Sequence, residues 1–392
     1  MKFEMEMLAG VDIGNAKTEV VFLENGELKH VRQPSVVSLL SSKPDDSSDM
    51  EEVQIVKSLT DNLSVNIFSK GLKYDGMYYV GNKALSSNKK ATNMGISLGQ
   101  KSTQDIPLIT PLSLVAAIAL QTAYKQTNKI PKTIDVTLQM VTAIPSSEYN
   151  NNKKSAKDLE ERFLHEHTIN LNVGEENVIV TINVKNIKVT EEGKTAMLAF
   201  LNSDPSILRH FNETYKLNAT PADFSDSKSL HADIGDGTSE FVFTHGYTPV
   251  PNSSHGEILG VGHATNEAIE MYRKEMNGLI GKILRQQFIE TLSQNTDKAE
   301  IAKEQMEKAT KGQAIAILES IIQSFSEQTS SSADYFFVHG GGSIVFKEQM
   351  YKDLLDFAAK VSGKVVWIPE EYATTMISRG NFYLAEALFG DK

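Results

Sequence analysis

Short runs of apolar residues recur along this chain, and each ends at glycine or at a polar turn, a pattern typical of strands that alternate with helices. Residues 7–14 and 18–23 are two such runs, separated by a few small or polar residues. They predict two strands joined directly as a hairpin, and the dipeptide Asn25-Gly26 ends the second strand with a turn signal.

The same hairpin pattern returns near the middle of the chain, at residues 230–234 and 240–244. The other predicted helices are 112–124, 151–165, 193–201, three segments within 262–328, 343–360 and 374–388, and the other strands are 77–80, 134–144, 168–173, 178–189, 335–339 and 365–368. Because a hairpin followed by a later strand and helices occurs twice, the sequence predicts an internal duplication of structure.

The length of 392 residues exceeds one ordinary hydrophobic core, so we expect an α/β protein of two domains. The first covers residues 1–150 with an insertion at about 32–105, and it includes the closing helix 370–392. The second covers 151–369 and contains a helical subdomain at about 262–328. The polar stretches 41–52 and 86–104 are expected to be loops.

Composition excludes several classes of site. The chain has no cysteine, which excludes disulfides, thiolate metal sites and a cysteine nucleophile. Its net charge of −11 disfavours direct binding to nucleic acid. The charged N-terminus lacks the apolar core of a signal peptide, and the longest apolar run, 114–120, is shorter than the ~20 residues of a membrane helix. We therefore expect a cytoplasmic protein without a membrane partner.

Two turns resemble each other, residues 12–18 with the sequence Asp-Ile-Gly-Asn-Ala-Lys-Thr and residues 233–239 with Asp-Ile-Gly-Asp-Gly-Thr-Ser. Glycine lets backbone N–H groups approach phosphate oxygens, and successive N–H groups in a tight turn bind anions. Thr18 and Thr238 offer hydroxyl donors, and Lys17 adds a positive charge. Asp12 and Asp233 suit Mg²⁺, which keeps several waters and takes one or two carboxylates. One such turn alone is more often an ordinary β-turn, but two predict phosphate binding.

Two further features have both a functional and a structural interpretation. Gly340, Gly341 and Gly342 lie between an apolar strand and a helix, where bare backbone can approach a ligand or simply make a flexible connection. They do not form a Walker A loop, because the Gly-Lys-Ser/Thr ending is missing. Glu148 follows the strand 134–144 and Pro145, where it could orient a water or serve as a helix-start carboxylate.

Together these motifs resemble the five-part signature of the actin, sugar-kinase and heat-shock ATPase superfamily. The two phosphate loops match residues 12–18 and 233–238, the connecting segments 141–149 and 373–384, and the adenosine motif 340–342. The resemblance implies an actin-like, ribonuclease H-like duplicated fold, in which two domains each have a mixed sheet flanked by helices and a nucleotide cleft lies between them.

The resemblance also implies roles for individual residues. Asp12 and Asp233 would position Mg²⁺ through water, and Glu148 and Asp233 would orient the attacking water. The residues that would hold the nucleotide are Gly14, Asn15, Lys17, Thr18, Gly235, Asp236, Gly237, Thr238, Gly340, Gly341 and Gly342, with Glu267 at the ribose. The expected nucleotide is ATP, with GTP as the alternative.

Within that superfamily the segment Ile144-Pro-Ser-Ser-Glu148 is similar to that of the ParM-type bacterial actins. The resemblance implies an ATPase that polymerises with ATP and segregates plasmids through a DNA-binding adaptor protein. Two alternatives stay open: a sugar-type small-molecule kinase of the same superfamily, and a non-motile actin-like scaffold. The heat-shock branch is disfavoured, because those ATPases carry a peptide-binding domain after the nucleotide-binding domain.

Overall fold

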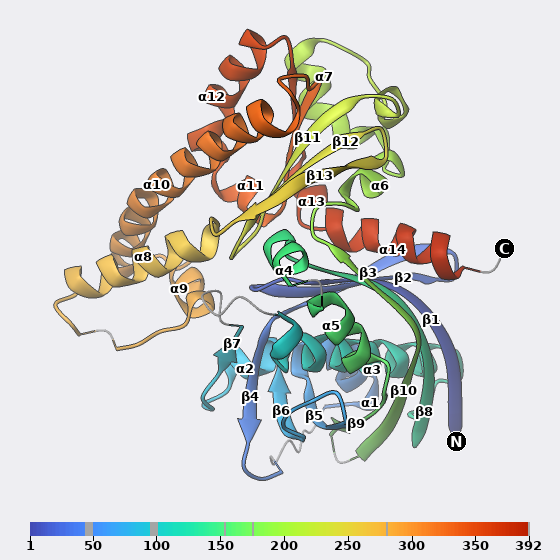
Figure 1. The fold of residues 1–392 in the computed structure, drawn as a ribbon. Helices are drawn as coiled ribbons and strands as arrows, with labels where there is room; N and C mark the ends of the chain where they lie inside the picture. Colours follow the sequence, from blue (N-terminus) through green and yellow to red (C-terminus); the bar gives the residue numbers. More distant parts are fainter. Residues whose placement is uncertain (44–49, 95–100, 153, 175, 280, 391–392) are drawn as a thin grey trace. The chain divides into compact units, whose positions relative to one another are not determined.

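The computed structural model describes residues 1–43, 50–94, 101–152, 154–174, 176–279 and 281–390 (Figure 1). The expected loops at 41–52 and 86–104 therefore fall partly outside the described residues. The chain divides into two compact units. The first unit comprises Met1–Ile144, Glu148–Thr190 and Asn381–Lys392, and the second comprises Pro145–Ser147 and Glu191–Gly380.

The first unit is built on a ten-stranded sheet with the order β3-β2-β1-β8-β10-β9-β5-β6-β4-β7. Its strands are β1 (Lys2–Ile13), β2 (Lys17–Glu24), β3 (Glu27–Pro34), β4 (Val36–Leu40), β5 (Ser64–Ser69), β6 (Gly76–Val80), β7 (Thr92–Asn93), β8 (Thr133–Ile144), β9 (Glu166–Val173) and β10 (Glu176–Glu191). The hairpin β1–β2 is antiparallel, whereas β8 runs parallel to β1 on its other side. The sheet is therefore mixed.

Helix α3 (Ile106–Thr127) packs against this sheet and carries much of its core. Leu112, Leu114 and Leu120 are all at most 1% exposed. Among the described residues α3 is the one helix long and apolar enough to cross a membrane, but 89% of its most apolar window is buried in the protein. That burial is typical of the core helix of a folded domain.

The start of α3 differs from the prediction. The helix begins at Ile106, before the predicted start at residue 112, so Pro111 lies inside it. A second proline, Pro107, occupies the first turn, where its missing N–H removes no helical hydrogen bond. Because α3 is buried on nearly all sides, its sequence has no polar face that could mark its true start.

The remaining helices of the first unit are α1 (Glu52–Lys57), α2 (Asn82–Ser86), most of α4 (Ser146–Asn151) and α5 (Ser155–Phe163). The closing helix α14 (Met376–Phe389) joins this unit from Asn381 onward. There the Asn381 side-chain amide donates a hydrogen bond of 2.9 Å to the Val11 carbonyl.

The second unit is built on a five-stranded sheet with the order β13-β12-β11-β14-β15. The strands are β11 (Lys228–Ile234), β12 (Ser239–His245), β13 (Thr248–Glu257), β14 (Tyr335–His339) and β15 (Lys364–Trp367). The helices are α6 (Ala196–Leu201), α7 (Arg209–Tyr215), α8 (Val261–Glu275), α9 (Arg285–Leu292), α10 (Asp297–Gln328), α11 (Gly341–Val345), α12 (Lys347–Lys360) and α13 (Glu370–Ala373). The rings of Phe200, Phe224 and Phe337 pack edge-on in its core, with centroids 4.8–5.7 Å apart.

The predicted duplication is confirmed by the two sheets. In each, an antiparallel meander of three strands is followed by a parallel strand: β3-β2-β1 and β8 in the first, β13-β12-β11 and β14 in the second. The outer strands β3 and β13 were missed by the sequence analysis. Both lie at a sheet edge and are rich in polar residues, because an edge strand needs no continuous apolar face.

The placement of two strands differs from the expected division. Strands β9 and β10, which the sequence analysis assigned to the domain 151–369, belong to the ten-stranded sheet of the first unit. Their antiparallel pairing, Ile169 opposite Val180, forms a second hairpin that adds to the first sheet. The alternation that predicted these strands carries no information about which sheet they enter.

Candidate functional site

The first candidate phosphate loop connects β1 and β2. The last paired residues of the hairpin are Ile13 and Thr18, so Gly14, Asn15, Ala16 and Lys17 make the connection. A Cβ atom on Gly14 would lie 2.8 Å from the carbonyl oxygen of Lys17, which is closer than side chains tolerate. Ser35 stabilises the loop with two hydrogen bonds. Its hydroxyl donates to the Gly14 carbonyl at 2.6 Å, and its N–H donates to the Ala16 carbonyl at 2.9 Å.

The second candidate loop has the same geometry. Its last paired residues are Ile234 and Ser239, and the Gly235 N–H closes the turn on the Thr238 carbonyl at 2.9 Å. A Cβ atom on Gly235 would lie 2.9 Å from that same oxygen. The two loops therefore correspond position by position, with Asp12 equivalent to Asp233 and Gly14 equivalent to Gly235.

The strand register shows that Thr18 and Thr238, which the sequence analysis gave the same role, are not at equivalent positions of the two loops. Lys17 is the counterpart of Thr238, and Thr18 is the counterpart of Ser239. The Thr18 side chain is fully buried, and its hydroxyl is hydrogen-bonded to Ser35 at 2.9 Å and Thr110 at 2.8 Å. The Thr18 hydroxyl thus stabilises the base of the first loop. Thr238, in contrast, lies within the second loop and is half-buried.

Both hairpins carry a buried glutamate that the sequence analysis missed. Glu19 pairs with Asp12 across β1–β2, and Glu240 pairs with Asp233 across β11–β12; they are 3% and 1% exposed. The signal was present, since each glutamate follows its aspartate by seven positions. Burial raises the pKa of Glu240 to about 8, helped by the nearby charge of Glu192, and its carboxyl accepts the Ser146 N–H at 3.1 Å.

The glycine turn packs directly on the end of β11. Gly340 has φ +83°, and a Cβ there would collide with the Asp233 carboxylate and lie 2.5 Å from the Ile234 carbonyl oxygen. A Cβ on Gly342 would meet the Ile234 side chain, whereas Gly341 faces open space. His339, fully buried, places Nδ1 3.4 Å from Asp233 Oδ1. The second unit therefore brings Asp233, its loop and the three glycines together.

The start of α8 fixes the second loop from another side. The N–H groups of Val261 and Gly262 donate to the carbonyls of Gly235 and Asp236 at 3.2 and 2.7 Å. The Asp236 carboxylate forms a buried ion pair with Arg285 of α9. Burial raises the pKa of Asp236, and Arg285 opposes that shift. The Asp236 side chain and carbonyl thus both anchor the loop to the helices α8 and α9.

Glu148 lies in the first turn of α4 and is 6% exposed. Its Oε2 accepts the Lys101 N–H at 2.8 Å, and its Oε1 accepts the Ser102 N–H at 3.1 Å and the Ser102 hydroxyl at 2.7 Å. The carboxylate is thus fixed by a segment some 45 residues earlier in the chain. Glu267, in contrast, is exposed on α8.

Among the residues that the structure describes, no group of three or more histidine, aspartate or glutamate side chains could hold a metal ion. The donor set suits Mg²⁺ bound mostly by water and phosphate, which needs only one or two carboxylates at most. Asp12 and Asp233, each half-buried at the end of a strand, fit that requirement.

Comparison with known proteins identifies the architecture. Residues 10–194 match the family model described as the N terminal domain of actin like proteins. This part of the chain is similar to the N-terminal domain of actin-like proteins. No protein with a curated description matches the sequence significantly.

Solved structures extend the likeness to the whole chain, which has an actin-like fold. The actin-like protein Alp7A has a TM-score of 0.67 at 17% identity, covering 99% of this chain and 97% of that one. A 15-stranded ParM filament from Clostridium botulinum gives 0.67 at 16% identity, covering 98% and 99%. ParM of Bacillus thuringiensis with ATP gives 0.59 at 16% identity, covering 97% and 98%.

The glycine turn of this actin-like chain gives a matched pair of substitutions. Gly340→Ala should lower the free energy of unfolding by at least about 1–2 kcal/mol, because alanine is strained at positive φ and its Cβ meets Asp233. Gly341→Ala should not destabilise, because its Cβ enters open space at the start of a helix. Urea denaturation of both variants tests this, and equal losses would contradict the geometry.

Glu240 should make stability depend on pH. Between the ordinary pKa of 4.5 and about 8, the folded protein keeps the Glu240 proton while the unfolded chain releases it. The free energy of unfolding should therefore fall as pH rises through this window, by on the order of 2–5 kcal/mol from this group. Glu240→Gln should remove that part of the loss in denaturation measured from pH 5 to 8. Glu319→Gln, at an exposed position of α10, is the control. If the free energy of unfolding of Glu240→Gln falls with pH as steeply as that of the native protein, Glu240 is not the group responsible.

Proposed function

We propose that this chain is a Mg²⁺-dependent ATPase that polymerises with ATP and segregates plasmid DNA through a DNA-binding adaptor. The observation that carries the proposal is the pair of geometrically equivalent turns, each with glycine against a carbonyl and an aspartate at the strand end. Such turns present backbone N–H groups to anions. Their occurrence once in each unit of a duplicated actin-like fold favours a nucleotide polyphosphate as the ligand.

Each part of the site has a proposed task. The backbone of Gly14 and Asn15 with the Lys17 ammonium holds phosphate oxygens, as do the N–H groups of Asp236, Gly237 and Thr238, while the Gly235 N–H closes the turn. Gly340, Gly341 and Gly342 lie against the nucleoside, where the open space at Gly341 admits a ligand. The exposed Glu267 is the proposed ribose contact. ATP is the proposed nucleotide, with GTP as the alternative.

Asp12 and Asp233 are the proposed metal carboxylates, acting through water. Bound Mg²⁺ would neutralise charge on the phosphates. Glu148 and Asp233 would orient the attacking water, because a carboxylate only accepts hydrogen bonds and so aligns the O–H bonds of water toward itself. Hydrolysis of this kind requires positioning and charge neutralisation more than covalent chemistry.

Relatives of the same fold support the assembly part of the proposal. Their structures include ParM with ATP, ADP and AMPPNP, and ParM as a filament. The net charge of −11 suits recruitment to DNA through a basic adaptor protein. A non-hydrolysing scaffold is the second candidate, because the Glu148 carboxylate is hydrogen-bonded to the protein itself.

Filament formation and hydrolysis are tested together with Glu148→Gln. ATP should raise light scattering of the native protein, and scattering should decay as phosphate is released. Glu148→Gln should reduce phosphate release by about 100-fold or more while scattering rises and persists. Glu161→Gln, exposed on α5, is the control. A native protein that neither scatters nor releases phosphate with ATP or GTP contradicts the proposal, and filaments without hydrolysis would favour the scaffold.

The metal role of Asp12 is tested by nucleotide affinity with and without Mg²⁺. Asp12→Asn should weaken binding of Mg-ATP by about 10–100-fold, the range typical of a group that acts through metal-bound water. Binding in the presence of EDTA should change little. Asp135→Asn, on β8 of the same sheet and paired with Lys2, should leave both affinities unchanged. Equal Mg-ATP affinity of Asp12→Asn and the native protein would exclude the metal role.

A further inference from the structure

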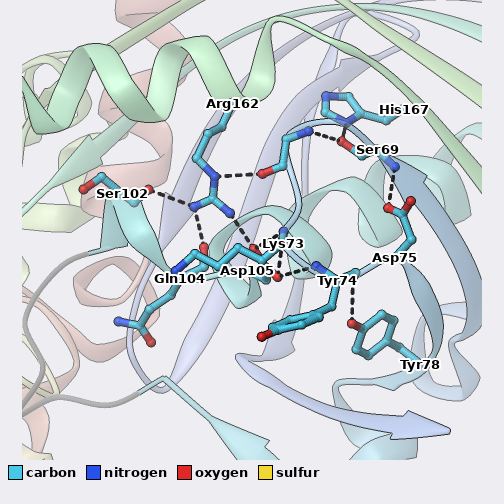
Figure 2. A network of polar contacts seen from close by, with 11 residues as sticks. Ser69, Lys73, Tyr74, Asp75, Tyr78, Ser102, Gln104, Asp105, Arg162 and His167 are labelled. Atoms are coloured by element: carbon cyan, nitrogen blue, oxygen red, sulfur yellow. Dashed lines mark hydrogen bonds and ion pairs between the residues drawn. The ribbon is translucent and has the colours of Figure 1, made fainter. Parts of the chain in front are cut away.

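The segment 101–105 of the first unit is held from two sides by the α4–α5 region. On one side Glu148 of α4 accepts hydrogen bonds from Lys101 and Ser102. On the other side Arg162 of α5 donates to the carbonyls of Ser102 and Gln104 at 2.8 and 2.6 Å (Figure 2). The Glu148 carboxylate therefore binds N–H groups of this segment, and the Arg162 guanidinium binds its carbonyls.

Arg162 connects this segment to the rest of the unit. Its Nη2 donates to Asp105 at 2.6 Å (Figure 2). Its Nε donates to the Gly71 carbonyl at 2.8 Å. Asp105 in turn accepts the N–H groups of Lys73 and Tyr74 at 3.0 and 3.2 Å. A guanidinium donates in a rigid planar fork, so Arg162 fixes the direction of each partner as well as its distance.

The main chain at Gly71 packs directly against the main chain at Arg162. A Cβ atom on Gly71 would collide with the carbonyl oxygen of Arg162. The Gly71 N–H donates to Ser69 Oγ at 2.9 Å, and that hydroxyl also contacts His167 Nδ1 at 2.7 Å. Arg162 is therefore seated in a turn that is itself hydrogen-bonded to β9, which limits how far segment 101–105 can move.

The Glu148 carboxylate retains capacity for one more partner. A carboxylate offers about four acceptor sites. Three are used by Lys101 and Ser102, two of them on Oε1, so the remaining capacity lies on Oε2. Helix α4 has only six residues, a length at which a helix depends on packing and hydrogen bonds from the rest of the protein. The orientation of that remaining site is thus set by the segment that binds the carboxylate.

We infer that Ser102 and Arg162 are positioning residues for Glu148: Ser102 fixes the carboxylate by its hydroxyl and N–H, and Arg162 fixes Ser102. This inference rests on the proposed role of Glu148 in orienting the attacking water. Neither residue touches the nucleotide in this scheme. Their contribution is to hold the free acceptor site of Oε2 in one direction, since small misplacements of a catalytic group cost large factors in rate.

The test compares steady-state ATP turnover of Ser102→Ala with that of the native protein. Loss of the 2.7 Å hydrogen bond should lower kcat about 10–100-fold, with KM for ATP changed by no more than about twofold. Ser64→Ala is the matched control, because Ser64 is also buried in this unit and accepts one side-chain hydrogen bond, 2.8 Å from Asn172. It should keep native kcat and KM.

A double variant separates positioning from a general structural role. Because Ser102 acts through Glu148, adding Ser102→Ala to Glu148→Gln should lower kcat no further. Effects that multiply in the double variant would overturn the inference. A Ser102→Ala variant within twofold of native kcat would overturn it too if Glu148→Gln is impaired, and the proposed function would then stand. If Glu148→Gln itself turns over ATP like the native protein, the proposed role of Glu148 fails and the inference with it.

Arg162→Lys tests the second step. Lysine keeps the charge but cannot donate to Gly71, Ser102, Gln104 and Asp105 at once. It should lower kcat about as much as Ser102→Ala, with ATP affinity retained, and it too should have no further effect in the Glu148→Gln background. Thermal unfolding confirms that the variant is folded at the assay temperature. A folded Arg162→Lys with native kcat would show that Arg162 does not position Glu148.

Discussion

The tight packing around glycines at the ends of strands is the constraint on which the rest of the candidate site depends. At Gly14 and Gly235 a carbonyl oxygen occupies the space of a Cβ, and at Gly340 the Asp233 carboxylate does so. These contacts need glycine, and tight turns of this kind are the ones in which successive backbone N–H groups can bind an anion. Side chains around them, such as Ser35 and Arg285, then hold the turns in place.

Much of the fold was predictable, because both hairpins are short apolar runs with turn signals. Edge strands were not, since β3 and β13 face solvent and lack an apolar face. The assignment of β9 and β10 to the first sheet also could not be derived, because alternation fixes which side of a strand is buried but not its neighbour. Pairing between distant segments is a property of three-dimensional packing.

The candidate site divides in the same way. The aspartates and glycines could be found from the sequence because turn geometry restricts residue type locally. The environment of Glu148 could not, since its partners Lys101 and Ser102 lie far away in the chain. The equivalence of Lys17 with Thr238 likewise required the register of the paired strands. Local rules identify which backbone can bind an anion, and long-range contacts decide what each acidic side chain does.

This chain shares its fold with ParM and Alp7A at 16–17% identity. A site made largely of backbone N–H groups places few demands on side chains beyond glycine at the points of contact. The inferred positioning residues are more restricted in type, because their side chains must reach several partners at once. Arg162 has four such partners, three carbonyls and one carboxylate. Because those partners are mostly backbone, the guanidinium fixes the course of the chain itself. The geometry around Glu148 is in this sense a consequence of how segment 101–105 is routed.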